Sequence, residues 1–567
     1  MQLSRLEQLP PELLSHLLAF LPLDSLLALS STSRRLHDFI ARAHLAHYTA
    51  RAMGARTPFS LQHLGFHRRA PSAQRALWAE RTSARWDEWD GRGAVVSHWG
   101  GKCLPVLKLW EVDRGVGAVL VGKGRELELW ATRGDGSVEV VPVVVPLPAS
   151  GGKGAAAAAA ARGALDDVTS LASGTRPGEI VVARHSGLVQ RLRVAHHADV
   201  ARGRPLVLEE TARYAMSGAV LGSSGGGGGG GTAAGATAVQ ALHSEGGLLA
   251  AASTTRLPPP SASAAASATS TPYGASPIHS LASSLSSRAA PKRHAVTLHS
   301  LSSPWQAPVV LPFAAKPWAV HLSPSRRYLT VGHTGLAPLS LFPLDSTGAP
   351  VSPDAPSILA RTPRSTSVYG LTSPGPLSAF ANPDETLLAA FYDSTARMYD
   401  LRVAPPPPSS SSSAGAAWDG DDGARPRNEV LRLSDPWSDD AAYALALGGA
   451  QGAVLAVGSA RNAAVRLFDL RSALAPLPLP ADGGEAEDQT ARRTRGVTAF
   501  APGRDRSPVY GLAGEASRFW GVTDRRGFVL DFDAFRARGE GAGGERVAFV
   551  GHEEGGGGTL RWMGERA

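Results

Sequence analysis

The first forty residues carry apolar side chains at helical spacing. Five leucines recur at intervals of three and four residues: Leu13, Leu14, Leu17, Leu18 and Leu21. This spacing predicts a helix with one wide apolar stripe. Pro10 and Pro11 suit its first turn, because proline has no N–H to lose there, and Pro22 should end it.

Two further short helices are expected after Pro22. Asp24 is a suitable N-cap for the second helix, and Ser31 or Ser33 can cap the third. Their inner faces would carry a second set of apolar residues: Leu26, Leu27, Leu29, Leu36, Phe39 and Ile40. A unit of roughly 40 residues cannot bury so many leucines by itself, so some of them must face another protein.

The order of these residues resembles an F-box, which implies docking on the Skp-type adaptor of a cullin ubiquitin ligase. The motif runs through Leu9-Pro10, Glu12-Leu13, Leu17, Phe20-Leu21, Leu26, Leu29-Ser30, Ser33 and Leu36. We assign residues 4–50 to it. The resemblance implies these adaptor-binding residues: Leu9, Pro10, Leu13, Leu14, Leu17, Leu21, Leu26, Leu29 and Leu36. The alternative is an ordinary three-helix cap whose leucines pack only internally.

Residues 51–94 are expected to form a helical linker. The segments Ala41 to Met53 and Ala73 to Trp89 are both rich in helix formers. We expect a stalk that rigidly joins the F-box to the next domain.

Beyond residue 95 the pattern changes to short strands separated by turn residues. In the clearest unit, Asn382 to Glu385 form a turn, Thr386 to Tyr392 a buried strand, and Thr395 to Asp400 an alternating strand. This unit resembles a WD-repeat, with Tyr399-Asp400 in place of Trp-Asp. Six weaker copies are Val116 to Trp130, Val168 to Val194, Val239 to Leu301, Trp318 to Leu344, Val454 to Arg471 and Val497 to Phe532.

About seven copies predict a β-propeller over residues 95–567, because propellers typically have four to eight blades. The fold class is therefore α+β multidomain: an all-α F-box and helical linker, then an all-β propeller with disordered loop insertions. No Gly-His lies upstream of a Trp-Asp at the usual spacing, so the repeats are degenerate, and other β-rich folds stay possible. Low-complexity inserts are expected near 149–163, 222–235, 255–293, 346–365, 404–427 and 475–493.

Composition narrows the function classes. The net charge of +8 is mild for 567 residues and gives no argument for nucleic acid. One cysteine allows neither a disulfide framework nor a zinc cluster, which fits a cytoplasmic or nuclear setting. No apolar run of about 18 residues predicts a membrane span, and no signal peptide is recognisable.

No catalytic constellation can be assembled, and no cofactor or metal is expected. His196-His197, the Asp419, Asp421 and Asp422 group, and Cys103 as a thioester carrier all lack the partners their chemistry would need. We therefore expect a non-catalytic substrate-recognition subunit of a Skp–cullin–F-box ligase, which brings an unknown protein substrate to a ubiquitin-charged enzyme. The alternative is a scaffold that uses its F-box only for adaptor-dependent assembly or trafficking.

In related F-box propellers, arginines of one propeller face bind phosphorylated substrate, since guanidinium pairs with phosphate in a bidentate manner. Arg133, Arg397 and Arg518 are conceivable counterparts here, without a commitment to any of them. The sequence does not identify the substrate-binding residues, which stay unknown.

Overall fold

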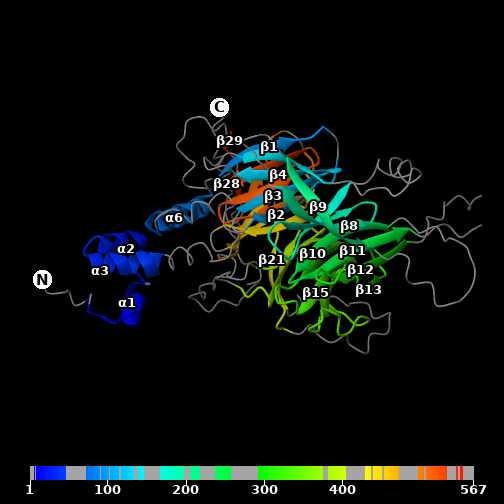
Figure 1. Cartoon of the computed structure of the whole chain (residues 1–567), viewed down its shortest axis with the longest axis horizontal. Coiled ribbons are helices and arrows are strands. Elements are labelled where there is room, and N and C mark those ends of the chain that lie inside the picture. The colour runs from blue at the N-terminus through cyan, green and yellow to red at the C-terminus, as the bar shows by residue number, and fades with distance from the viewer. Residues whose placement is uncertain are drawn as a thin grey trace, which may run out of the picture.

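The computed structural model describes residues 6–45, 72–145, 167–196, 205–216, 237–256, 292–374, 381–403, 428–471, 496–532 and 545–552, with short gaps inside these ranges. It has a small helical domain at the N-terminus and a large β domain, with one long helix between them (Figure 1). Among the described helices, none has the length and apolarity to cross a membrane.

Three short helices form the N-terminal domain: α1 (Pro11–Leu18), α2 (Leu23–Ser30) and α3 (Arg34–Phe39), followed by one π-helical turn, Ile40–His44. The predicted start at Pro11 is confirmed, as is the third cap, because the Ser33 hydroxyl accepts a hydrogen bond from the Leu36 N–H at 3.2 Å. The cap predicted for the second helix is wrong. Pro22 occupies the N-cap position, and Asp24 lies in the first turn, where a carboxylate favours the helix dipole.

The linker helix α6 (Ser72–Glu88) agrees with the helix expected over Ala73 to Trp89. Its first half packs on the helical domain through Ala73, Ala76 and Leu77. Most of the helix expected over Ala41 to Met53 lies outside the described residues.

The β domain consists of four-stranded antiparallel sheets in chain order, and short additional pairings join the first to the second and the fourth to the fifth. The first is β2 (Val106–Asp113), β3 (Val116–Lys123), β4 (Glu126–Thr132) and β5 (Val138–Val144). The second is β6 (Val168–Ser173), β7 (Glu179–Arg184), β8 (Leu188–His196) and β9 (Leu206–Ala215). The third is β10 (Thr237–Glu245), β11 (Leu248–Arg256), β12 (Lys292–Ser300) and β13 (Val309–Phe313).

Three more sheets repeat this order. They are β14 (Pro317–Leu322), β15 (Tyr328–Gly335), β16 (Leu339–Pro343) and β17 (Ser357–Ala360); β18 (Thr366–Thr372), β19 (Thr386–Phe391), β20 (Ala396–Asp400) and β21 (Glu429–Leu433); and β22 (Ala442–Gly448), β23 (Val454–Ser459), β24 (Ala464–Asp469) and β25 (Gly496–Phe500). The two strands predicted around Thr386 to Asp400 are confirmed as β19 and β20, with a left-handed Ser394 (φ 72°) in their turn. The alternation expected for the second strand is wrong, because Ala396 to Tyr399 are all buried.

The seventh sheet joins the two ends of the β domain. Strands β26 (Gly511–Gly514), β27 (Arg518–Val522) and β28 (Arg526–Asp531) take β1 (Arg92–His98) as their fourth strand, with Arg92 opposite Asp531. Two short C-terminal strands, β29 (Glu545–Arg546) and β30 (Phe549–His552), add to the outer edges of β1 and β25.

The first strand of each sheet contacts the first strands of its two neighbours around a full circle, ending with β26 against β2. The described part of the chain therefore forms a closed seven-bladed β-propeller, and β1 closes the ring as the outer strand of the last blade. Each predicted copy falls in a different blade. The copy at Val497 to Phe532 also includes β25 of the sixth blade.

One predicted insert is wrong. Residues 346–365 contain β17, and the turn before it is fixed because the Asp345 carboxylate accepts bonds from the N–H groups of Thr347 and Ala349 at 2.8 and 2.9 Å. The other predicted inserts lie largely outside the described residues. The propeller begins at Arg92, three residues before the expected boundary.

Buried arginine–acid pairs connect strands and loops inside the propeller. Arg466 lies 3.5 Å from Asp435, and Arg518 lies 2.9 Å from Asp531. Arg191 lies 2.8 Å from Glu179. Each pair ties one blade strand to another strand or loop, so these ion pairs belong to the internal framework of the blades.

Candidate partner-binding faces

The first candidate face lies on α1 of the helical domain. Three large apolar side chains are exposed there or just after it: Leu13 (54%), Leu17 (50%) and Phe20 (75%). Exposure of three neighbouring large apolar side chains on so small a domain is typical of a protein-binding surface. We call these three residues the α1 face.

The predicted adaptor-binding residues divide into two groups. Leu14, Leu26 and Leu36 are buried and form the domain core with Leu18, Leu23 and Ile40, while their assignment to an adaptor contact stays a prediction. A leucine without exposed surface holds the domain together but cannot touch a partner unless the domain rearranges. Helical spacing alone could not separate the two groups, because α1 carries leucines on more than one side.

The other predicted residues keep some accessible surface. Pro10, Leu13 and Leu17 are exposed, while Leu9, Leu21 and Leu29 are half-buried. Adaptor binding by these six residues stays a prediction. Phe20 was missing from the set, although it stands inside the motif between Leu17 and Leu21.

Helix α6 fixes the α1 face relative to the propeller. Its residue Trp86 is 1% exposed and stacks on Phe532 with ring centroids 3.6 Å apart. The Trp86 indole also donates a hydrogen bond to the carbonyl oxygen of Ala516 at 2.9 Å. Trp78, which precedes Trp86 on the same helix, also packs against Ala516. These contacts make α6 part of the propeller core.

The contacts of α6 distinguish the two faces of the propeller. Two residues near Trp86 lie just after inner strands: Gly449 directly follows β22, and Ala516 is the second residue after β26. The helix therefore packs where inner strands end, which we call the proximal face. The opposite side, where the inner strands begin, is the distal face.

Four aromatic side chains lie in contact on the distal face. Tyr369 lies 5.0 Å from both Trp318 and Tyr443, and Tyr443 lies 6.3 Å from Tyr510, measured between ring centroids. Trp318 and Tyr443 are the second residues of β14 and β22, Tyr369 lies in the middle of β18, and Tyr510 directly precedes β26, so the four belong to successive blades. We call Trp318, Tyr369, Tyr443 and Tyr510 the aromatic arc.

β-Bulges place three of these side chains. The pairing register shifts at Trp318 in β14, at Tyr369 in β18 and at Tyr443 in β22. A bulge inserts one unpaired residue and changes the direction of its side chain. A β-bulge therefore positions an aromatic side chain in the first strand of three successive blades.

The tyrosine side chains of the arc carry no charge at neutral pH, and a lysine lies beside the tryptophan at one end of the arc. Burial raises the pKa values of Tyr369, Tyr443 and Tyr510 above the usual value for tyrosine, so their hydroxyls stay protonated at neutral pH. The Lys316 ammonium lies 3.4 Å from the centroid of the Trp318 ring, which is a cation–π contact. Burial, and then the charge of Lys292, lower the pKa of Lys316.

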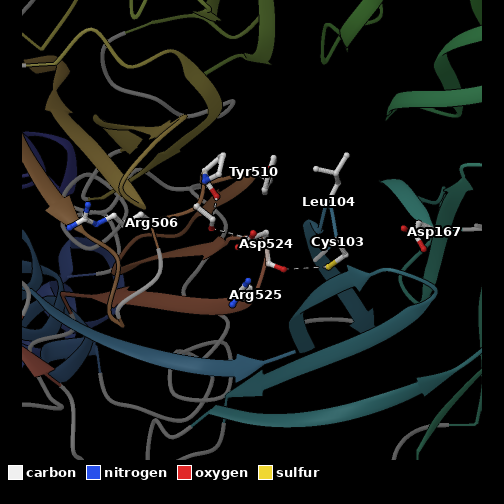
Figure 2. Close-up of a pocket in the computed structure, with 9 residues that line it drawn as sticks. Cys103, Leu104, Asp167, Arg506, Tyr510, Asp524 and Arg525 are labelled. Atoms are coloured by element: carbon white, nitrogen blue, oxygen red, sulfur yellow. Dashed lines mark hydrogen bonds between the residues drawn. The ribbon is translucent and has the colours of Figure 1, made fainter. Parts of the chain in front are cut away.

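An open cleft of about 780 Å³ adjoins Tyr510 at the junction of the last and first blades. Figure 2 shows Cys103 and Asp524 on its walls, and the Cys103 thiol lies 3.9 Å from the carbonyl oxygen of Asp524. Burial is the largest cause that raises the pKa of the Cys103 thiol, so the thiolate is disfavoured. This environment is the opposite of the one that activates a nucleophilic cysteine.

Two of the arginines considered as phosphate contacts, Arg397 and Arg518, are buried and cannot reach a phosphate on a partner. Arg397 is 4% exposed, lies between Asp393 and Glu429, and covers the Phe391 ring at 4.1 Å. Arg518 has no exposed surface and pairs with Asp531. Both are internal, and this idea is wrong for them.

The remaining candidates stay predictions. Arg133, His197 and the Asp419, Asp421 and Asp422 group lie outside the described residues. Within the described part of the chain, no group of three or more histidine, cysteine or acidic residues could hold a metal ion.

Comparison with known proteins supports the N-terminal assignment. The F-box domain family matches residues 6–47. No curated protein matches the sequence of the chain. Among solved structures, the chain is similar to the β-propeller domain of Cps50 (Swd1) from Myceliophteria thermophila, with 10% sequence identity, a TM-score of 0.39, and coverage of 77% of this chain and 99% of that chain. The propeller assignment rests on the strand pairing and the ring of inner strands. The chain thus carries an F-box domain at residues 6–47, joined by α6 to a seven-bladed β-propeller.

Proposed function

We propose that this protein is the substrate-recognition subunit of a Skp–cullin–F-box ubiquitin ligase in the cytoplasm or nucleus. The F-box domain docks on the Skp-type adaptor, and the propeller binds the protein to be ubiquitinated. The observation that carries this proposal is the exposed α1 face on a matched F-box domain, because Leu13, Leu17 and Phe20 need a partner to cover them.

The position of α6 supports a rigid delivery mechanism. Trp86 is fixed inside the propeller while Ala76 is fixed inside the F-box domain, so one continuous helix spans both. A substrate on the distal face would lie on the opposite side of the propeller from this helix. Holding a substrate lysine near a ubiquitin-charged enzyme converts a bimolecular attack into an effectively intramolecular one. In this proposal no residue of the chain takes part in the chemical step.

Co-purification followed by reconstitution tests the proposal. The full chain should capture the adaptor and, through it, the cullin, and the assembled complex should ubiquitinate a protein captured by the propeller. Replacing Leu9 and Pro10 with Ala should abolish adaptor capture. Partners that accumulate on an F-box deletion variant are substrate candidates.

Two outcomes would contradict this function. Adaptor capture without cullin, or assembly without ubiquitination of any bound partner, would favour the scaffold role in assembly or trafficking. Full adaptor capture by the Leu9 and Pro10 variant would mean that the motif is not a docking site.

A further inference from the structure

The aromatic arc has the features of a site for an extended peptide. It is a continuous row of large flat side chains on the face opposite α6, and the rings are half-buried, so each keeps accessible surface. Aromatic side chains offer large contact area at low entropic cost, and aromatic-lined grooves are the usual docking surfaces for proline-rich segments.

The hydroxyl groups of the arc match the backbone of such a segment. Among the described residues, the hydroxyls of Tyr443 and Tyr510 have no hydrogen-bond partner, and both stay protonated donors at neutral pH. A polyproline II helix makes no internal hydrogen bonds, so its carbonyl oxygens are free acceptors. Proline contributes no N–H that would need an acceptor on the arc.

One end of the arc carries a positive charge. Lys316 covers Trp318, and it takes part in none of the ion pairs found between described residues. Burial lowers the pKa of Lys316, and among the described residues a second cation, Lys292, lowers it further. An acidic residue of a bound peptide would supply the missing counter-charge.

We propose that the aromatic arc binds an extended proline-rich segment of the partner protein, oriented by an acidic residue that pairs with Lys316. This inference rests on the proposed function, because it names the chemistry of the substrate segment. Successive centroid distances of 5.0, 5.0 and 6.3 Å separate Trp318 from Tyr510. A polyproline II segment rises about 3.1 Å per residue, so about five residues span the arc.

The first experiment measures binding of labelled peptides to the full chain by fluorescence anisotropy. The main probe has one aspartate followed by a tract of about five prolines, matching the length of the arc. In one control peptide glycine and serine replace the prolines, and in another lysine replaces the aspartate. We expect the main probe to bind at least about tenfold more tightly than either control, in line with the loss of one interface anchor.

Variants then locate the site. Tyr443→Ala should weaken the main probe about tenfold or more, and Tyr443→Phe should show how much of that loss comes from the hydroxyl. Trp305→Ala is the matched control, because Trp305 is 83% exposed and lies between β12 and β13 on the proximal face. Lys316→Glu should weaken the aspartate peptide and strengthen the lysine peptide.

Three results would overturn the proposal: no binding of the main probe at millimolar concentration, equal binding of the glycine–serine peptide, or preference of the unmodified chain for the lysine peptide. The last result would indicate a cation-binding arc. Because anisotropy needs neither adaptor nor cullin, failure here is separate from failure of the ligase function, which co-purification and ubiquitination measure.

Discussion

The F-box domain and the propeller bury their apolar side chains to different degrees. The F-box domain, with helices of eight, eight and six residues, leaves Leu13, Leu17 and Phe20 exposed. The propeller buries several large clusters, and β1 seals its ring by pairing with β28. The blades of the propeller cover one another around a closed ring, whereas the small helical domain keeps the α1 face exposed to a partner. The α1 face is therefore the surface of the F-box domain that we expect a partner to cover.

The largest expected effect lies at the joint between the two domains. Trp86→Ala removes a side chain that is 1% exposed, stacks on Phe532 and bonds the Ala516 carbonyl. We expect the propeller to lose about 3–5 kcal/mol of unfolding free energy. Chemical denaturation of the full chain measures this, with Trp305→Ala as the exposed control. Equal stability of the two variants would contradict the claim that α6 is part of the propeller core.

Neighbouring leucines of α1 should respond differently. Leu14→Ala should cost about 2–5 kcal/mol, because Leu14 is buried in the F-box core, whereas Leu13→Ala should cost under about 1 kcal/mol. Hydrogen exchange across α1 to α3 measures both losses. If both variants lost the same stability, the division between core and α1 face would be wrong.

The propeller should lose stability in mild acid. Burial lowers the pKa of His299 to about 4; burial, and then the charge of Lys108, lower that of His321 to about 4. Both histidines are 4% exposed. Since the unfolded chain binds protons near pH 6.5, the stabilisation is fully present above that pH and is lost as the pH falls toward 4. Between pH 7 and pH 5 each histidine should account for about 2 kcal/mol.

Denaturant titrations at the two pH values measure this change, and His321→Leu should remove part of it. An unchanged pH dependence in that variant would show that His321 is not the group responsible. The F-box domain provides an internal comparison, because neither histidine belongs to it.

The smallest expected effect concerns one helix cap. Ser33→Ala removes the acceptor for the Leu36 N–H and should cost the F-box domain about 1 kcal/mol. Ser31→Ala is the control, since the Ser31 hydroxyl is exposed and only bonds the Ala28 carbonyl of its own turn. Thermal unfolding should place the two variants apart; coincidence would mean that α3 does not depend on its cap.

Much of the fold could be predicted from the sequence where local chemistry decides it. Pro11 and Ser33 mark helix starts by their own backbone and side-chain properties, and the unit from Thr386 to Asp400 carries its turn residues and its buried first strand. The alternation expected in its second strand was wrong, because β20 is covered on both faces. The cap at Asp24 was wrong because Pro22 occupies the position before α2. The prediction of a disordered insert at 346–365 was wrong. The composition of this segment gives no strand signal, but β17 forms there because it pairs with β16.

The candidate sites depended more on tertiary structure. The motif identified α1, but the inward or outward orientation of Leu14 and Leu17 is set by packing against α2, α3 and α6. The aromatic arc had no sequence signal, because Trp318 and Tyr510 are brought near each other only when four blades align their inner strands. The burial of Arg397 could not be predicted either, because its partner Glu429 lies on β21, far along the chain.

Adaptor binding by α1-face variants tests the central claim most directly. Leu17→Asp and Phe20→Asp place charge on exposed positions and should leave the unfolding temperature nearly unchanged, since surface changes usually stay within about 0.5 kcal/mol. We predict that each variant loses adaptor binding by at least about tenfold in calorimetric titration, while peptide binding to the aromatic arc is retained. Undiminished adaptor affinity in the double variant would contradict the account, because the exposed α1 face would then not be the docking surface.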